Sequence, residues 1–163
     1  QMLGGEIRDP QRLESNQAQA QGIGLLPTQT QFLPEKATFQ VRAVVRAGSG
    51  WFRAIDGQPL EGYEIHMGET TGSSPNWLQI VEQNHRPVHL LDGSASADGR
   101  IWGCYLHGIF GNDAFRHAWL KSLGWEGAGM SRTESFENSL NALAGAVENA
   151  LGMEKLERIV WGK

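Results

Sequence analysis

The chain has 163 residues, of which 40% are hydrophobic and 20% charged, as is ordinary for a globular protein. Its formal net charge of −4 and the lack of a basic block argue against nucleic acid or a membrane surface as a partner. The single cysteine excludes an internal disulfide framework, and no apolar run is long enough to span a bilayer. We therefore expect one domain in a reducing, cytoplasmic setting.

The first third of the chain predicts a helix end, a loop and a strand. Residues 1–7 resemble the last turns of a helix, which would stop before Pro10 because a residue that precedes proline avoids the helical region. Residues 11–34 are rich in glutamine without a clear period and predict mostly loop. Apolar and polar residues then alternate from 38 to 45, which predicts a half-buried strand.

A second alternating segment covers residues 62–70. Its pattern assigns Tyr63, Ile65 and Met67 to one face and Glu64 and His66 to the other. The apolar face should turn toward the core, so the favoured interpretation of Glu64 and His66 is a polar face in contact with solvent. The two side chains share that face, and a carboxylate beside an imidazole could orient it or raise its pKa.

Two further strands and two helices are predicted after this segment. Residues 88–93 and 100–106 read as strands joined by a loop, and residues 112–124 as a helix that is capped at Asn112 or Asp113. Ser131 and Glu134 have the spacing of a capping box. The helix that follows has an apolar face made of Phe136, Leu140, Leu143, Ala144, Val147 and Leu151.

These elements predict an α/β fold over residues 1–163, with a strand-rich part at 36–110 and a helical part at 112–163. The opening helix has no strand before it. We therefore expect that the N-terminal part of the domain is missing from the sequence.

Cys104 and His107 are the first candidates for catalysis, because a thiol near an imidazole can act as a nucleophile. In a strand, however, side chains three positions apart point to opposite faces, and a lone buried cysteine is common in cores. Cys104 is therefore not proposed as a nucleophile. His107 stands at the end of an apolar strand and before Gly108, a position that commonly presents a side chain to a cleft. No histidine or cysteine spacing indicates a metal site, and no glycine-rich nucleotide motif is complete.

Four stretches together resemble one family: QMLGGEIRDP, GIGLLPTQTQF, GYEIHMGET and DGRIWGCYLHGIFGNDAFR. In order and character they are similar to the C-terminal glutamine amidotransferase domain of cobyric acid synthases, which act in cobalamin (vitamin B12) biosynthesis. The resemblance covers about the first two thirds of the chain with specific motifs. It implies a flavodoxin-like, class I glutamine amidotransferase-type fold.

The resemblance also implies a function and partners. The parent protein would be an ATP-dependent ligase in which this domain hydrolyses glutamine. The ammonia would amidate corrin-ring carboxylates and convert adenosylcobyrinic acid a,c-diamide to cobyric acid. ATP and Mg²⁺ would bind to an N-terminal synthetase domain, and no cofactor is expected in this chain. Two other classes stay open: a related ligase, either cobyrinic acid a,c-diamide synthase or a cell-wall amidating enzyme, and a non-catalytic amidotransferase-like binding module.

The family's motifs map onto four positions. The segment that carries the nucleophilic cysteine ends in Gln-Met-Leu-Gly, which matches residues 1–4, so the cysteine is expected four residues before Gln1, outside this chain. The catalytic histidine of the family's Tyr-Leu-His-Gly motif maps onto His107, and Gln1 matches a glutamine near the substrate pocket. Cys104 replaces a structural threonine. Ile109 stands where many amidotransferases have an acid that orients the histidine, so Glu64 or His66 could take that part. Glu64 and His66 are also, with Gln1, the candidate substrate-binding residues. The chain alone is expected to be inactive.

Overall fold

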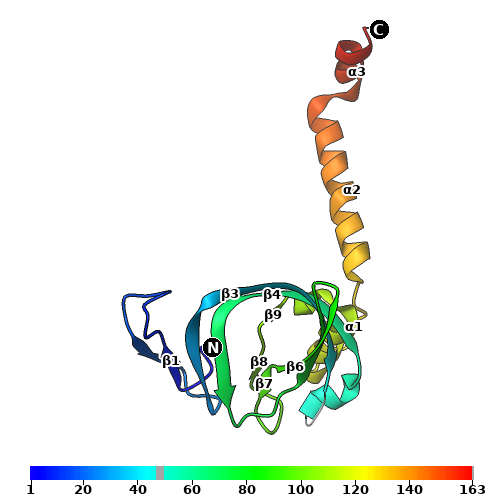
Figure 1. Ribbon diagram of the computed structural model, residues 1–163. Helices are drawn as coiled ribbons and strands as arrows, with labels where there is room; N and C mark the ends of the chain where they lie inside the picture. Colours follow the sequence, from blue (N-terminus) through cyan, green and yellow to red (C-terminus); the bar gives the residue numbers. More distant parts are fainter. Residues whose placement is uncertain (47–49, 163) are drawn as a thin grey trace. The chain divides into compact units, whose positions relative to one another are not determined.

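The computed structural model describes residues 1–46 and 50–162 and divides into two compact units, residues 1–126 and 127–163. Among the described residues, the strands and the first α-helix belong to the first unit, and two further α-helices belong to the second (Figure 1). Sheet and helices together confirm the predicted mixed α/β class. No helix among the described residues is both long and apolar enough to cross a membrane.

The main sheet has seven strands. Five follow the order β2-β1-β3-β4-β9, while β5 pairs with the far part of β3 and with β6. Only β1 and β3 run parallel, and the other described pairs are antiparallel. The bounds are β1 Glu6–Arg8, β2 Gln19–Gln21, β3 Thr28–Val45, β4 Pro59–Gly72, β5 Leu78–Gln83, β6 Arg86–Asp92 and β9 Leu106–His107. A separate two-stranded sheet pairs β7 (Ser94–Ala95) with β8 (Trp102–Gly103).

The long strands β3 and β4 lie side by side and form the curved centre of the sheet (Figure 1). Their register shifts between Phe32 and Ala37. The shift includes Pro34, which has no amide hydrogen to give to the ladder and therefore suits an irregular position. On β3, the inward Val41, Ala43 and Val45 are buried, as the alternation predicts.

The core lies where β3, β4 and β5 meet a 3₁₀ helix, η1 (Gly50–Ile55), and the helix α1 (Asp113–Ser122). The helix predicted at residues 112–124 is confirmed by α1, and Phe115 of this helix is fully buried. Aromatic rings dominate this core: Trp77 stacks on Phe52 at a centroid distance of 4.6 Å and on Phe115 at 5.8 Å. A second 3₁₀ helix, η2 (Ile109–Gly111), connects β9 to α1.

The expected helix at residues 1–7 is wrong, and the expected loop at 11–34 is wrong in part. Residues 6–8 form β1 instead, because they join the parallel ladder with β3 that begins at Gln29. Just before it, the amide of Gly5 donates to the carbonyl of Thr28 at 2.8 Å. The loop region contains β2 and the first part of β3. Strands therefore begin well before residue 36, because pairing with distant residues overrides the local pattern.

The predicted strand at residues 88–93 corresponds to β6, whereas the one at 100–106 divides into β8 and β9. Cys104 and Tyr105 lie between those two strands. The amide of Tyr105 donates to the side-chain carboxylate of Asp92 at 3.1 Å and not to a backbone carbonyl of a strand ladder. The chain thus leaves one ladder and enters another at the segment that contains the cysteine.

The second unit consists of α2 (Arg132–Leu151) and α3 (Met153–Trp161). The predicted capping box is confirmed: the amide of Glu134 donates to Ser131 Oγ at 3.1 Å, and the amide of Ser131 donates to Glu134 Oε2 at 2.9 Å. Gly152 ends α2 in the left-handed conformation that favours glycine, with φ of 62°. The predicted apolar face of α2 is present, and its large side chains are exposed.

Candidate active site

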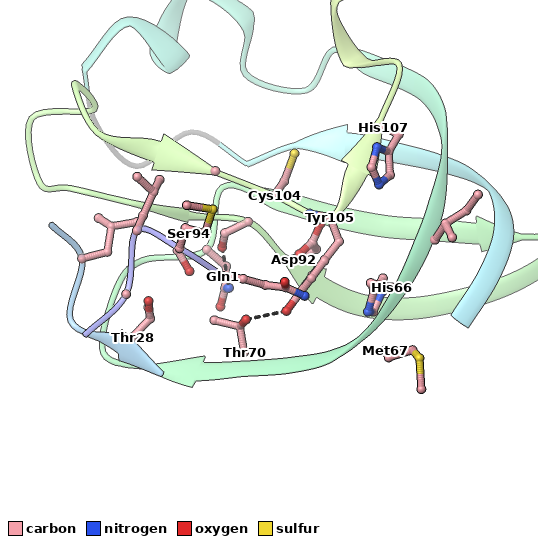
Figure 2. A pocket seen from close by; sticks show the side chains of 18 of the residues that line it. Gln1, Thr28, His66, Met67, Thr70, Asp92, Ser94, Cys104, Tyr105 and His107 are labelled. Carbon is pink, nitrogen blue, oxygen red and sulfur yellow. Dashed lines mark hydrogen bonds between the residues drawn. The ribbon is translucent and has the colours of Figure 1, made fainter. Parts of the chain in front are cut away.

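A cavity of about 640 Å³ opens in the first unit beside β4 and the end of β6 that carries Asp92 (Figure 2). Four of the residues singled out in the sequence line it: Gln1, His66, Cys104 and His107. Asp92, Tyr105 and Thr70 line it as well, although none of them is a candidate site residue from the sequence. The structure therefore brings together most of the candidates and adds polar groups of its own.

The two faces of β4 are the reverse of the prediction. Glu64 is only 5% exposed, whereas Tyr63 and Ile65 are 47% and 43% exposed. The reason is close packing on the inward face, where Gly62 lies against Leu106 and Gly68 lies against Thr30. A Cβ atom at Gly68 would stand 2.7 Å from Thr30 Cγ2, so glycine is required there. These contacts fix the register of β4, and with it the orientation of Glu64 and His66.

His66 is held in place by its neighbours. Its Nδ1 lies 2.9 Å from the carbonyl oxygen of Gly68, and its ring stacks on Tyr105 at a centroid distance of 3.9 Å. A carbonyl oxygen only accepts, so Nδ1 carries the hydrogen and Nε2 keeps a free lone pair when the ring is neutral. His66 can therefore accept a hydrogen bond from a group in the cavity.

The hydroxyl of Tyr105, on whose ring His66 stacks, is the first of three hydroxyl groups connected by hydrogen bonds. This hydroxyl lies 2.6 Å from Thr70 Oγ1, the bond drawn as a dashed line in Figure 2. Thr70 Oγ1 in turn lies 2.6 Å from Oγ1 of Thr30, which is fully buried. Each hydroxyl both donates and accepts, so this chain fixes the ring on which His66 stacks.

Asp92 is the acidic group that the sequence reasoning missed. Burial raises the pKa of its carboxyl, against the lowering effect of hydrogen bonds from the amides of Gly93 and Tyr105 and of the positive charge that His66 can carry. Among residues 1–46 and 50–162, no side chain donates a hydrogen bond to it. The available signal was an aspartate followed by glycine at a strand end.

Glu64 is also buried, and burial raises the pKa of its carboxyl. Gln83 Nε2 donates to Glu64 Oε2 at 2.9 Å, an interaction that lowers the pKa and only partly offsets the burial. Gln83 belongs to β5, and both β4 and β5 pair with β3. Glu64 thus connects β4 to β5 across the strand that separates them.

Cys104 has the environment of an unreactive thiol. Burial, and next the negative charge of Asp92, raise the pKa of Cys104 to about 12. Its Sγ donates to the carbonyl oxygen of Leu106 at 3.6 Å. A thiol with this pKa forms almost no thiolate near neutral pH, and the thiolate is the nucleophilic species.

His107 is the last residue of β9, and its side chain is exposed at the edge of the cavity (Figure 2). Gly108, next in the chain, has a φ of 77°, so the chain turns away directly after the histidine. Within the described part of the chain, the His107 ring makes no hydrogen bond or ion pair with a carboxylate; it stacks on Tyr63 at a centroid distance of 5.2 Å. Both ring nitrogens are available for proton transfer.

Gln1 lines the cavity close to the inward side of β4, where its amide nitrogen would stand 2.7 Å from a Cβ atom at Gly68. Among the described residues, no group of three or more His, Cys, Asp or Glu side chains could hold a metal ion. The arrangement offers proton transfer and hydrogen bonding to a small polar molecule, with His107 and His66 as the imidazole side chains at the cavity.

Comparisons with known proteins all point to one family of glutamine amidotransferase domains. The model of the CobB/CobQ-like glutamine amidotransferase domain matches residues 1–115. Cobyric acid synthase of Chloroflexus aurantiacus is 42% identical over 164 residues, which cover 98% of this chain and 32% of that protein. Cobyric acid synthase of Chloroflexus aggregans is 43% identical over 162 residues, or 98% of this chain and 31% of that protein. Cobyric acid synthase of Rhizobium meliloti is 43% identical over 151 residues, which cover 93% of this chain and 28% of that protein. The chain thus spans about a third of the length of these curated relatives.

Proposed function

Because this chain belongs to the CobB/CobQ-like glutamine amidotransferase domain family, we propose that it is part of the glutaminase of a cobyric acid synthase. Its mixed α/β fold is consistent with a class I glutamine amidotransferase. The observation that carries the proposal is the position of His107, exposed at a strand end beside a cavity and free of any carboxylate partner in the described chain. Such an imidazole can move protons in both directions near neutral pH.

In this proposal His107 serves a cysteine nucleophile that precedes Gln1 in the full-length protein. His107 accepts the thiol proton as sulfur attacks the carboxamide carbon of glutamine, and then gives that proton to the leaving nitrogen. The carbon–nitrogen bond breaks, ammonia leaves and a thioester remains. His107 next takes a proton from the attacking water, the carbon–sulfur bond breaks, and the returning proton restores the thiol as glutamate is released.

The other candidate residues are proposed to bind glutamine or to hold the structure of the site. Gln1 and His66 line the cavity, and the free Nε2 of His66 can accept from the amide or ammonium group of glutamine. Glu64 is bonded to Gln83 and is proposed to hold β4 in place. The high pKa of Cys104 supports its exclusion as the nucleophile.

The wider reaction is proposed from the relatives, which are about three times as long as this chain. An N-terminal synthetase domain would bind ATP and Mg²⁺ and activate side-chain carboxylates of adenosylcobyrinic acid a,c-diamide. Ammonia from glutamine would then complete the amides of cobyric acid. We place this enzyme in the cytoplasm, which fits the single free cysteine.

The test uses the full-length protein that contains this chain. Glutamine-dependent and ammonia-dependent amidation of adenosylcobyrinic acid a,c-diamide are measured separately, because only the former requires the glutaminase. His107→Ala should lower the glutamine-dependent rate by at least about a hundredfold and leave the ammonia-dependent rate unchanged.

Two matched variants complete this test. His85→Ala removes a histidine whose side chain is 91% exposed, and Cys104→Ser removes the half-buried thiol. Both should retain the glutamine-dependent rate. A His107→Ala protein with full glutamine-dependent activity, or a Cys104→Ser protein without it, would contradict the proposal. Amidation of cobyrinic acid in place of its a,c-diamide would reassign the chain to the sister ligase.

A further inference from the structure

The proposed mechanism needs a histidine that is held in one orientation, yet the usual orienting acid is absent. Ile109 stands where an acid could follow the histidine by two residues, and it is buried in the core. Within the described residues, no side chain accepts a hydrogen bond from the His107 ring. Another contact must therefore restrict the imidazole.

That contact is the ring of Tyr63. The two rings are nearly parallel, with an interplanar angle of 11° and centroids 5.2 Å apart. Tyr63 and His107 are directly opposite each other in the antiparallel ladder of β4 and β9. Opposed residues on one face of such a ladder have Cβ atoms about 5 Å apart, so the contact is built into the strand pairing.

The backbone around both residues leaves little freedom for this pair. Gly62 packs so closely on β9 that an added Cβ would meet the carbonyl oxygen of His107 and Leu106 Cδ1. On the other strand, Leu106 is buried and anchors β9 beside His107. Gly108 then turns the chain, and its position lies within van der Waals reach of the Tyr63 ring. Both rings are therefore carried on fixed strands.

We infer that Tyr63 is the positioning residue for His107 and replaces the orienting acid of other amidotransferases. The inference rests on the proposed glutaminase function. One face of the imidazole lies on the Tyr63 ring, which restricts rotation of the histidine side chain while that side chain stays exposed to solvent. The π face of the tyrosine also favours the imidazolium that forms when His107 takes a proton. Tyr63 itself exchanges no proton in this scheme.

The kinetic test measures glutamine hydrolysis by the full-length protein in Tyr63 variants. Tyr63→Phe keeps the ring and should retain kcat, whereas Tyr63→Ala should lower kcat by about tenfold or more, since misplacement by an ångström can cost a hundredfold. KM for glutamine should change little, because Tyr63 touches the histidine and not the substrate. Glu61→Ala, which shortens a 78% exposed side chain on the same face of β4, is the matched control and should leave kcat unchanged.

A spectroscopic test detects the contact between the Tyr63 and His107 rings and does not depend on enzyme activity. In the 163-residue chain, the ring current of Tyr63 should shift the His107 ring protons upfield in the NMR spectrum. Tyr63→Phe should preserve this shift, Tyr63→Ala should abolish it, and Glu61→Ala should leave it in place. His107 protons that do not respond to Tyr63→Ala would overturn the inference.

The outcomes separate this inference from the proposed function. If His107→Ala is inactive and Tyr63→Ala has normal kcat, the positioning role is wrong and the glutaminase assignment stands. If His107→Ala is fully active with glutamine, the assignment of the catalytic histidine is wrong and the positioning role falls with it. Loss of kcat in Tyr63→Phe equal to that in Tyr63→Ala would instead show that the hydroxyl, and not the ring, is required.

Discussion

Burial decides what the ionisable residues of the cavity can do. Cys104 and Glu64 are both withdrawn from water, and in both the uncharged form is favoured. For the thiol this means chemical inertness, since its pKa is about 12. For Glu64 it means a cost to the folded protein at neutral pH, because the carboxyl must ionise inside or remain protonated. The side chain of His107, by contrast, is exposed.

The cost at Glu64 leads to a prediction about pH. Burial raises the pKa of Glu64 in the folded chain above the ordinary value of 4.5, which applies to the unfolded chain. Between the unfolded-state pKa and the folded-state pKa, the folded chain therefore binds more protons than the unfolded one. The free energy of unfolding therefore falls as pH rises through this interval. Glu64→Gln removes the penalty, and its amide oxygen can still accept from Gln83. The variant should be more stable than the parent at pH 7, and the difference should shrink toward pH 4, as measured by urea unfolding.

Glu69→Gln is the control, because Glu69 lies on the same strand with an exposed side chain. Its unfolding free energy should follow that of the parent chain across the same pH range. If Glu64→Gln is less stable than the parent at pH 7, then the ionised carboxylate stabilises the fold, and the role assigned to burial is wrong.

For single residues, the sequence predicted some of the residues that line the cavity but not which side of the sheet their side chains face. The motif around His107 predicts a histidine presented at a strand end, and the structure has it there. The inward orientation of Glu64 and His66 was not predictable, because strand alternation fixes two faces without saying which one is buried. Asp92 was missed because its role depends on Tyr105, thirteen residues away, and no spacing rule connects the two.

Among the elements, the pairing of β4 with β9 matters most for the site, although only Tyr63 and Glu64 of β4 pair with it. This short ladder depends on Gly62. A Cβ at this position would stand 2.8 Å from Leu106 Cδ1 and would also collide with the His107 carbonyl, which belongs to backbone and cannot move alone. The missing side chain is thus what allows His107 to lie beside Tyr63.

Gly62→Ala should therefore displace β9. We expect it to destabilise the chain by about 1–3 kcal/mol, as overpacking usually does, and to reduce glutamine hydrolysis by the full-length protein. Gly5→Ala is the matched control, since its Cβ would meet nothing nearer than the Thr28 carbonyl oxygen at 4.0 Å. Thermal unfolding and the glutaminase assay measure the two effects. Equal stability and activity in both variants would show that β9 does not depend on this close approach.

Elements with strong local signals were predictable and those made by distant pairing were not. The capping box and apolar period of α2, and the helical span of α1, are encoded within one segment. By contrast, residues 6–8 become a strand only because β3 lies beside them. The division of residues 100–106 into β8 and β9 likewise depends on partners elsewhere in the chain.

For the molecule as a whole, the two units differ in how far their apolar side chains are exposed to solvent. The first unit buries the aromatic rings of its core, whereas the second leaves the apolar side chains of α2 exposed within the described structure. The exposed side chains of α2 include Phe136 at 63%, Leu143 at 61% and Leu151 at 52%. On α3, Ile159 is 73% exposed and Trp161 71%. Contiguous apolar surface of this kind associates in water.

We therefore expect the isolated 163-residue chain to self-associate through α2, where a second copy offers a matching apolar face. Leu143 lies midway along the length of this face, whereas Asn149 lies on the opposite side of the helix. Leu143→Glu should weaken dimer formation at least about tenfold, the effect of withdrawing one buried leucine. Asn149→Glu adds the same charge and should leave association unchanged. Sedimentation equilibrium over a range of concentrations measures both. A parent chain that stays monomeric throughout, or equal weakening by the two variants, would show that the apolar face of α2 does not drive association.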